Sequence, residues 1–185
     1  LVGSEMCIRD RYFNSTEGRK LLIRATFQQA KEDGVTVLEI GEDVWGLKEF
    51  FHNDIDELVE SFTSAQREIA PEIELRLQIG LSRHCPISYL EDCLSYFWGN
   101  KNFYSIDLYG DEFAQPIENF KGIYRRAKKE GLRLKAHVGE WGTAKDIRTA
   151  VEELELDEVQ HGIAAAGDES VIRFLAENKI RLNIT

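Results

Sequence analysis

Residues 132–142 read LRLKAHVGEWG and are the segment from which the fold is inferred. Its first half predicts a short buried strand, because the aliphatic residues end abruptly at Gly139 and Gly142, where the backbone is free to turn. His137 therefore lies at the carboxyl end of the predicted strand, and Glu140 follows three positions later. An imidazole and a carboxylate that leave the same strand end are suited to metal binding combined with proton transfer.

The His-x-x-Glu spacing is weak evidence by itself. It should occur by chance in roughly one chain in five of average composition. The alternative interpretation is that His137 is a hydrogen-bonded histidine at the rim of the fold and Glu140 an ordinary solvated acid. The rest of the chain decides between the two interpretations.

Predicted strands and helices alternate along the chain. Buried strands are predicted to begin near positions 35, 75, 103, 133, 158 and 180. A first helix is predicted from about Thr16 to Asp33, and later helices follow the start signals Asn53, Pro86, Pro116, Thr143 and Asp168. Strict alternation implies a parallel sheet, because each helix is the crossover that returns the chain to the same edge.

Side chains that can take part in catalysis or metal binding follow several different predicted strands. A doubly wound sheet would show a glycine-rich phosphate turn after an early strand, but residues 40–43 read IGED, with a single glycine and two acids. An active site at the carboxyl face of a barrel instead draws residues from many strand ends. The strand-end residues are Glu42, Arg83, His84, Asp111, Glu112, His137, Glu140 and His161. The sequence therefore predicts an α/β fold, an incomplete (β/α)8 TIM barrel.

The composition favours a soluble cytoplasmic enzyme or binding domain. A chain of 185 residues with 43% hydrophobic content can bury the core of one domain. The formal net charge of −10 argues against a nucleic-acid partner, and no apolar run is long enough to span a membrane. The three cysteines form no CxxC pair and no disulfide framework, which fits a reducing compartment.

The two ends of the chain indicate an internal fragment. Residues 1–11, LVGSEMCIRDR, resemble the translation of an adapter used in sequencing libraries, so we exclude them from the fold as a non-native scar. Residues 12–185 are then the partial barrel domain. Residues 179–185, KIRLNIT, read as a strand that is just reaching its end when the sequence stops.

Three motifs together resemble those of the adenosine deaminase family of zinc-dependent barrel hydrolases. They are IDLYGDE at residues 106–112, HVGE at residues 137–140 and HG at residues 161–162. Each motif is weak alone, and the set is fairly specific. The resemblance covers the chain from about Ser15 to Thr185. It implies that the predicted strands are about strands 2 to 7 of the barrel, with their helices.

The resemblance implies a role for each of four residues. His137 would be a ligand of Zn2+, Glu140 would donate a proton to the purine ring nitrogen, and His161 would orient the metal-bound hydroxide. Gly110 would offer a backbone donor to the substrate base. These residue types suit the chemistry, because zinc lowers the pKa of bound water to about 7 and the hydroxide can attack the ring carbon that carries the amino group.

The function that the resemblance implies is the hydrolytic deamination of a purine nucleoside, adenosine to inosine and ammonia. Zn2+ would be the cofactor and the nucleoside the small-molecule partner. The family's first strand carries an HxH ligand pair and its eighth an aspartate ligand, and neither is present here. We therefore expect the activity to belong to the longer parent protein, with little zinc binding or turnover by this chain alone. The oligomeric state stays open.

Several alternatives remain. The substrate could be adenine or a modified nucleoside, and a non-catalytic module derived from a barrel is compatible with the fold. A two-metal amidohydrolase would need a bridging lysine near residues 108–110, which read LYG. A barrel glycosidase could use Glu112 and Glu140 as its two acids, but it leaves the strand-end histidines without a role.

Some further residues have less specific interpretations. Arg83 and His84 are about equally compatible with a salt-bridged pair at the rim and with a substrate contact. Trp45, Phe50 and Phe51 are predicted to be core residues rather than a stacking surface for a purine.

Overall fold

The computed structural model describes residues 15–184, which divide into two compact units. The first unit ends at Leu77 and the second begins at Gln78. The predicted scar at residues 1–11 and the final Thr185 lie outside the described residues. Among the helices of residues 15–184, none has the length and apolar character needed to cross a membrane.

The strands pair in the order in which they occur in the chain. They are β1 (Val37–Asp43), β2 (Glu74–Ser82), β3 (Phe103–Tyr109), β4 (Arg133–Val138), β5 (Glu158–His161) and β6 (Arg181–Asn183). The pairings from β3 to β6 are parallel. A doubly wound sheet reverses its strand order at a switch point, whereas a barrel keeps the sequential order. The prediction of an α/β fold with an incomplete (β/α)8 barrel is therefore confirmed.

Helices separate the successive strands. They are α2 (Thr16–Glu32), α3 (Val44–Phe51), α4 (Ile55–Ile69), α5 (Ile87–Leu94), α6 (Lys121–Glu130), α7 (Ala144–Leu154) and α8 (Glu169–Glu177), with short 3-10 helices η1 (Ile117–Phe120) and η2 (Ile163–Gly167). Two predicted starts are confirmed. Before α7, the Thr143 hydroxyl accepts from the amide of Asp146, whose carboxylate accepts from the Thr143 amide. Before α8, the Asp168 carboxylate accepts from the amides of Ser170 and Val171.

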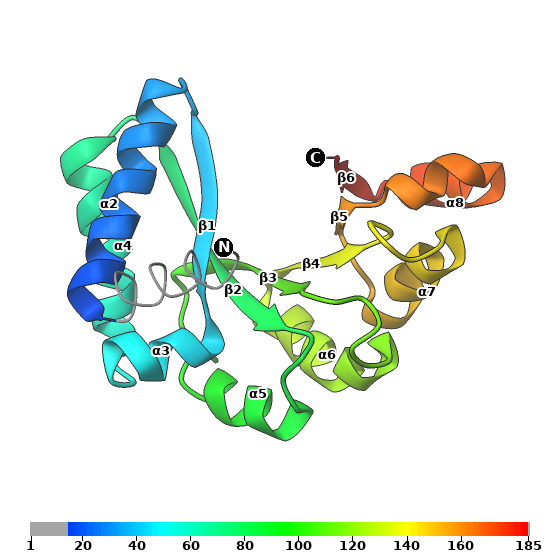
Figure 1. Ribbon diagram of the computed structural model, residues 1–185, viewed down its shortest axis with the longest axis horizontal. Coiled ribbons are helices and arrows are strands. Elements are labelled where there is room, and N and C mark those ends of the chain that lie inside the picture. The colour runs from blue at the N-terminus through cyan, green and yellow to red at the C-terminus, as the bar shows by residue number, and fades with distance from the viewer. Residues whose placement is uncertain (1–14, 185) are drawn as a thin grey trace, which may run out of the picture. The chain divides into compact units, whose positions relative to one another are not determined.

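In the first unit, α2 packs against α4 (Figure 1). Ser15 caps α2, because its hydroxyl accepts a hydrogen bond from the amide of Gly18 at 3.0 Å. The buried residues of the two helices are Ile23, Phe27 and Ala30 on α2, and Leu58, Val59, Phe62 and Ala65 on α4. Full burial of one aliphatic or aromatic side chain contributes about 1.5–3 kcal/mol, so this helix pair supplies much of the core of the unit.

No sequence pattern predicts α3. This helix has only 8 residues and is apolar along most of its length, so no helical periodicity marks it in the sequence. The prediction that Phe50 and Phe51 are core residues is confirmed, because their exposed fractions are 5% and 0%. Trp45 contacts the ring of Phe50 edge to face, with ring centroids 5.8 Å apart.

The predicted cap of the following helix is wrong by one residue. Asp54, and not Asn53, precedes α4, and its carboxylate accepts a hydrogen bond from the amide of Glu57 at 2.9 Å. His52 and Asn53 both have left-handed backbone, with φ of 52° and 64°. The two residues reverse the chain after α3, a turn that a prediction without α3 does not require.

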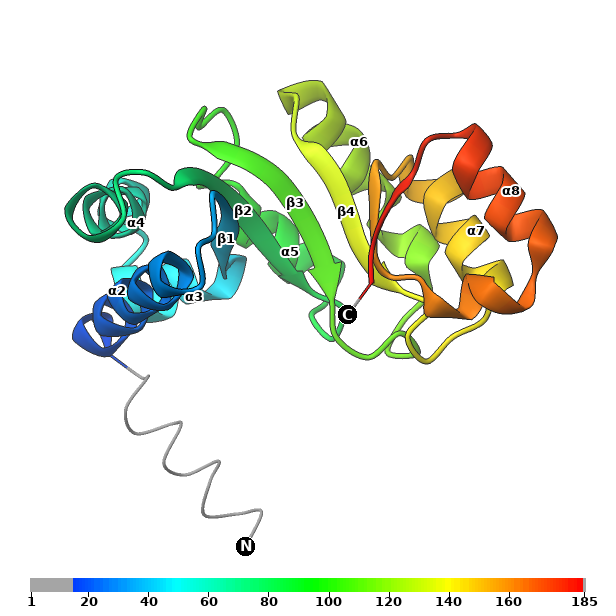
Figure 2. The same cartoon turned by 90° about the horizontal axis from the view of Figure 1, so that it is seen from above.

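In the second unit, β4 separates two environments. Leu134, Ala136 and Val138 are buried on the side where β4 packs against α6 and α7. Figure 2 shows α6, α7 and α8 on one side of strands β3 to β6. Side chains alternate along a strand, so the residues between these, including His137, project to the inner face of the sheet.

Glu42 lies at the carboxyl end of β1 and is only 8% exposed. Its carboxylate folds over the first turn of α3, where a Cβ on Gly46 would lie 2.8 Å from Glu42 Oε1. Burial raises the pKa of Glu42 to about 7, although Arg19, with its Nε 3.4 Å from Oε2, opposes this rise. Relative to the unfolded chain, the fold therefore shifts the ionisation of Glu42 toward the protonated form.

We expect replacement of the Glu42 carboxylate to change how the free energy of unfolding depends on pH. A raised acid pKa stabilises the fold below the usual value of 4.5, and this contribution is lost as the pH rises through about 7. The free energy of unfolding of Glu42→Gln minus that of the parent should therefore be larger at about pH 8.5 than at about pH 5. The gain should approach about 3 kcal/mol, since a tenfold change in an ionisation constant corresponds to about 1.4 kcal/mol. Urea unfolding at the two pH values measures it, with the exposed Glu49→Gln as control. Equal stability differences at both pH values would contradict the prediction.

Candidate active site

His137 ends β4 on the inner face and is held by an acid from the neighbouring strand. Its Nδ1 lies 3.3 Å from Oδ1 of Asp107 on β3, and the Asp107 side chain is only 3% exposed. Burial lowers the pKa of His137, but the hydrogen bond and charge of Asp107 outweigh it and raise the pKa above its usual value. A carboxylate on one ring nitrogen fixes the ring orientation and leaves Nε2 for a ligand, the usual arrangement behind a metal-binding histidine.

His161 lies beside His137, and Glu140 lies beside His161. The rings of the two histidines have centroids 5.2 Å apart, and Nε2 of His161 lies 3.4 Å from Oε2 of Glu140. The structure thus brings together three residues that the sequence placed at two strand ends. The Glu140 side chain is 40% exposed and that of His161 is 18% exposed, so the group lies at the edge of the interior.

The backbone of His161 explains how it joins the group. His161 pairs in register with Val138, whose side chain is buried on the helix side of the sheet. A regular strand would therefore direct His161 away from His137. Instead, His161 and Gly162 both have left-handed backbone, with φ of 65° and 66°, and the strand ends there. The HG dipeptide marks this turn in the sequence.

Gly110 follows β3 with a φ of 102° and lies against His84. A Cβ at Gly110 would be 3.2 Å from Cδ2 of His84, so the close approach of the two residues needs glycine. The amide of Asp111 donates to Nε2 of His84 at 3.4 Å. His84 therefore supports the turn that contains Gly110.

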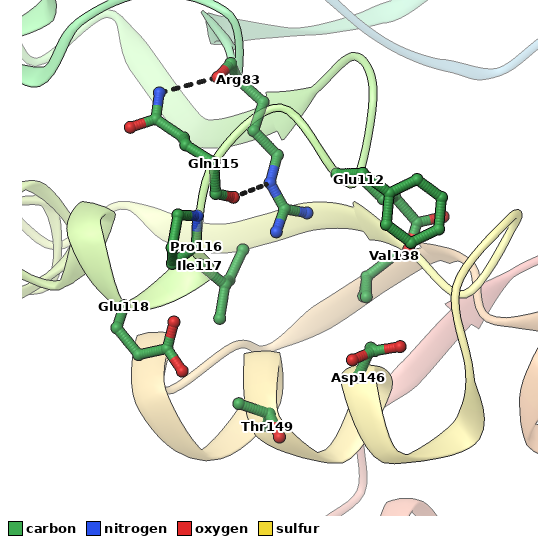
Figure 3. Close-up of a pocket in the computed structure, with 10 residues that line it drawn as sticks. Arg83, Glu112, Gln115, Pro116, Ile117, Glu118, Val138, Asp146 and Thr149 are labelled. Atoms are coloured by element: carbon green, nitrogen blue, oxygen red, sulfur yellow. Dashed lines mark hydrogen bonds between the residues drawn. The ribbon is translucent and has the colours of Figure 1, made fainter.

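Arg83 lies in a different environment from His84. Its Nε donates to the carbonyl oxygen of Gln115 at 3.0 Å, and the Gln115 amide donates back to the Arg83 carbonyl at 2.7 Å. Figure 3 shows the guanidinium directed into a cavity of about 290 Å³, across from Glu118 and Asp146. The cavity lies between the loop after β3 and helix α7, so Arg83 does not point to the histidine pair.

Two residues near His137 were not assigned a role from the sequence. Asp107 lies inside the IDLYGDE motif, but only the structure shows its contact with His137. Tyr109, two residues later on the same face of β3, has its ring centroid 6.2 Å from that of His137. Its hydroxyl is buried and has no hydrogen-bond partner among the described residues. The alternation of side chains along β3 is the signal that could have found both.

The described residues contain no group of three or more His, Cys, Asp or Glu side chains placed to hold a metal ion. The imidazole of His137 fits the role of one ligand, because Asp107 orients it through the other ring nitrogen. A metal site that includes His137 would therefore need further ligands from outside residues 15–184.

The comparisons with known proteins agree on one family. The model of the family described as adenosine deaminase matches residues 8–185. A protein of Treponema pallidum, named provisionally as an adenosine/adenine deaminase, is 37% identical over 163 residues, which are 88% of this chain and 54% of that protein. An adenine deaminase of Rhodospirillum rubrum is 31% identical over 167 residues, 84% of this chain and 48% of that protein. The chain thus spans about half the length of these curated relatives.

Solved structures show the same fold. An adenine deaminase from Arthrobacter aurescens superposes with a TM-score of 0.76 at 22% identity, over 91% of this chain and 52% of that one. An amidohydrolase from Burkholderia ambifaria, solved with bound Zn, has a TM-score of 0.79 at 21% identity, over 92% of this chain and 48% of that one. At these identities the likeness supports the barrel fold alone.

The contact between Asp107 and His137 predicts the outcome of a titration. Asp107→Asn removes the charge that outweighs burial, so the pKa of His137 should fall in the metal-free protein. An NMR titration of the histidine ring resonances measures the change. Asp111→Asn, at an exposed position in the loop after β3, is the control and should leave the titration of His137 unchanged. An unchanged pKa of His137 in Asp107→Asn would show that Asp107 does not set it.

Proposed function

This chain belongs to the adenosine deaminase family, and on that premise we propose that the full-length protein hydrolytically deaminates a purine nucleoside or base. The observation that carries the proposal is the grouping of His137, Glu140 and His161 at the ends of the adjacent strands β4 and β5. If the protein were a glycosidase or a non-catalytic module, the paired histidines His137 and His161 would have no functional role.

The proposed reaction replaces the amino group of the purine with the oxygen of water and releases ammonia. Attack on the ring carbon places electron density on the neighbouring ring nitrogen, which must gain a proton. Glu140 in its acid form is the proposed donor, because its carboxyl group is accessible and lies next to His161. His161 is proposed to orient the attacking water, since its Nε2 faces Glu140 at 3.4 Å. Gly110 is proposed to contact the substrate base through its backbone.

A zinc ion is part of the proposal for the full-length protein. His137 is the ligand that this chain would supply, and its support by Asp107 is what such a ligand requires. When bound, the metal would lower the pKa of water toward neutrality and so provide the nucleophile. The amidohydrolase of B. ambifaria with bound Zn has this fold, which is compatible with a metal in the barrel.

Adenosine is the substrate that the sequence resemblance implies, and adenine is the second candidate. The relative from R. rubrum is named an adenine deaminase, and that from T. pallidum is named for both substrates. Measuring kcat/KM of the full-length protein with adenosine, adenine and N6-methyladenosine ranks the candidates. Failure to hydrolyse any of the three, with release of ammonia from adenosine or adenine or of methylamine from N6-methyladenosine, would overturn the proposed function.

Two substitutions in the full-length protein separate a proton donor from a metal ligand. Glu140→Gln should keep its zinc and lose turnover by about 100- to 10,000-fold, because the amide preserves shape but cannot protonate the ring nitrogen. His137→Ala should lose zinc first, and activity as a result, because a ligand is gone. Elemental analysis and turnover are measured on the same purified samples.

A histidine remote from the group serves as the control for these variants. His52 ends α3 in left-handed backbone, which asparagine tolerates, so His52→Asn should keep both zinc and turnover. Loss of zinc from Glu140→Gln, or its near-normal turnover, would show that Glu140 is not the acid.

A further inference from the structure

The carboxylate of Glu112 binds the loop that carries Glu140. Glu112 lies in the loop after β3 and is only 7% exposed. Its Oε2 accepts a hydrogen bond from the amide of Gly139 at 2.8 Å, and its Oε1 accepts from the amides of Glu140 and Trp141, both at 2.9 Å. Three consecutive backbone donors thus converge on one buried anion, as they do in anion-binding nests.

Two glycines restrict this loop further. Gly139 has a φ of 78°, and a Cβ there would lie 2.4 Å from Cδ1 of Ile147 on α7. At Gly142 a Cβ would lie 2.7 Å from Oε2 of Glu112 and 3.1 Å from Oδ2 of Asp146. The loop therefore packs against a helix on one side and against the Glu112 carboxylate on the other. Its backbone has little freedom to move.

We propose that Glu112 is a positioning residue, which fixes the backbone of residues 139–141 and thereby holds the Glu140 carboxylate beside His161. The inference rests on the proposed function, in which Glu140 is the proton donor. A donor must lie within hydrogen-bond reach of the atom that it protonates, and small displacements cost large factors in rate. Glu112 acts on that placement through the amide of Glu140 itself.

The same geometry argues against a role for Glu112 as an acid that reacts with the substrate. Both of its oxygens accept hydrogen bonds from backbone amides, and the side chain lines the cavity next to α7. Figure 3 shows Glu112 on this cavity wall, together with Val138 and Asp146. The glycosidase alternative needs Glu112 and Glu140 as a catalytic pair, so it loses one of its two acids.

Glu112→Gln in the full-length protein is the direct test. The amide group of glutamine replaces one acceptor with a donor, which must face a backbone N–H, so at least one of the three hydrogen bonds is lost. Turnover should fall about 10- to 100-fold, as for a misplacement of roughly 1 Å, while KM and zinc content stay unchanged. Glu118→Gln, an exposed acid that lines the same cavity, is the matched control and should retain parental kcat.

The double variant Glu112→Gln/Glu140→Gln distinguishes positioning from general loss of structure. If Glu112 acts through Glu140, the double variant should be no slower than Glu140→Gln alone. Parental kcat in Glu112→Gln, or two losses that multiply in the double variant, would overturn the inference.

Gly142→Ala tests the same contact without changing Glu112. The added methyl would lie 2.7 Å from Oε2, the far end of a side chain, so the carboxylate must shift. Turnover should fall with KM unchanged, as in Glu112→Gln. Gly122→Ala in α6 is the control, because no atom lies within 4 Å of a Cβ there. This variant decides the inference even where Glu112→Gln fails to fold, since parental kcat in Gly142→Ala would overturn it.

The outcomes separate this inference from the proposed function. A parent without deaminase activity, or an active Glu140→Gln, removes the proposed function and this inference with it. An active parent, an inactive Glu140→Gln and parental kcat in both loop variants would overturn the positioning role alone.

Discussion

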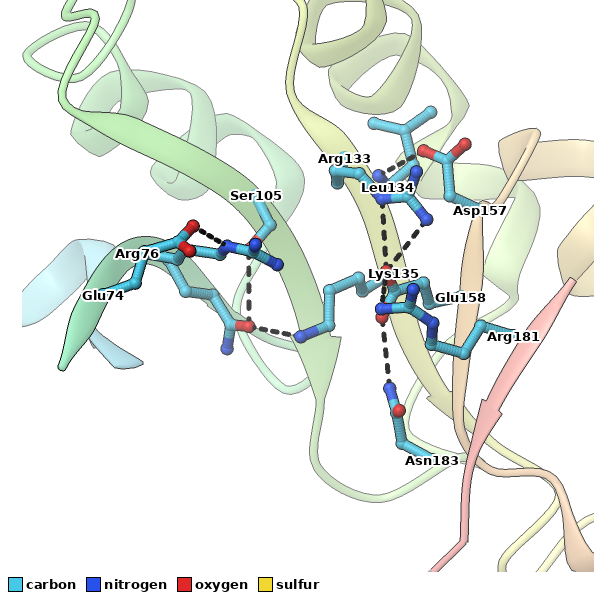
Figure 4. A network of polar contacts seen from close by, with 11 residues as sticks. Glu74, Arg76, Ser105, Arg133, Leu134, Lys135, Asp157, Glu158, Arg181 and Asn183 are labelled. Atoms are coloured by element: carbon cyan, nitrogen blue, oxygen red, sulfur yellow. Dashed lines mark hydrogen bonds and ion pairs between the residues drawn. The ribbon is translucent and has the colours of Figure 1, made fainter. Parts of the chain in front are cut away.

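The inner face of β4 carries the basic residues Arg133, Lys135 and His137, which are buried or half-buried, and each contacts a polar partner on another strand. At its amino end, Arg133 donates two hydrogen bonds to Oε1 of Glu158, a β5 residue that is only 2% exposed. Arg181 and Asn183 of β6 bind the same carboxylate from the other side (Figure 4). Although burial raises the pKa of Glu158, these hydrogen bonds and charges outweigh it and lower the pKa. A slip of one residue would turn Glu158 to the opposite face, so this cluster fixes the register of three strands.

The same pairing continues along β4 to the candidate active site. Lys135, in the middle of the strand, donates to Oε1 of Gln78 at 2.8 Å. The amide nitrogen of Gln78 donates to Oδ2 of Asp107 at 3.3 Å, and Asp107 in turn holds His137. A continuous set of polar contacts therefore connects a buried lysine to the proposed metal ligand. Typical barrel interiors are filled mainly by branched aliphatic residues, and the polar layer of this chain departs from that pattern.

Local sequence patterns predicted the strands and the ends at which the histidines lie, because aliphatic runs and terminating glycines act over a few residues. They identified His137 and Glu140 as a pair for the same reason. They did not predict the contacts of Asp107 and Glu112, which join residues 27 to 30 positions apart. They also missed α3, where packing of a short apolar segment, rather than periodicity, determines the helix. Alternation along β3 could indicate which face Asp107 lies on, but its pairing with His137 depends on the sheet register, which local patterns do not determine.

Both supports of the site come from one strand and the loop after it. Asp107 on β3 holds His137, and Glu112 five residues later holds the amide of Glu140, three residues beyond His137. The ladder pairs Asp107 with Lys135, two residues before His137, so a single register brings both supports within reach of the residues they hold. A shift of β3 against β4 would release the two together. The relative placement of the proposed ligand His137 and the proposed acid Glu140 thus depends on the β3–β4 pair, through Asp107 and Glu112.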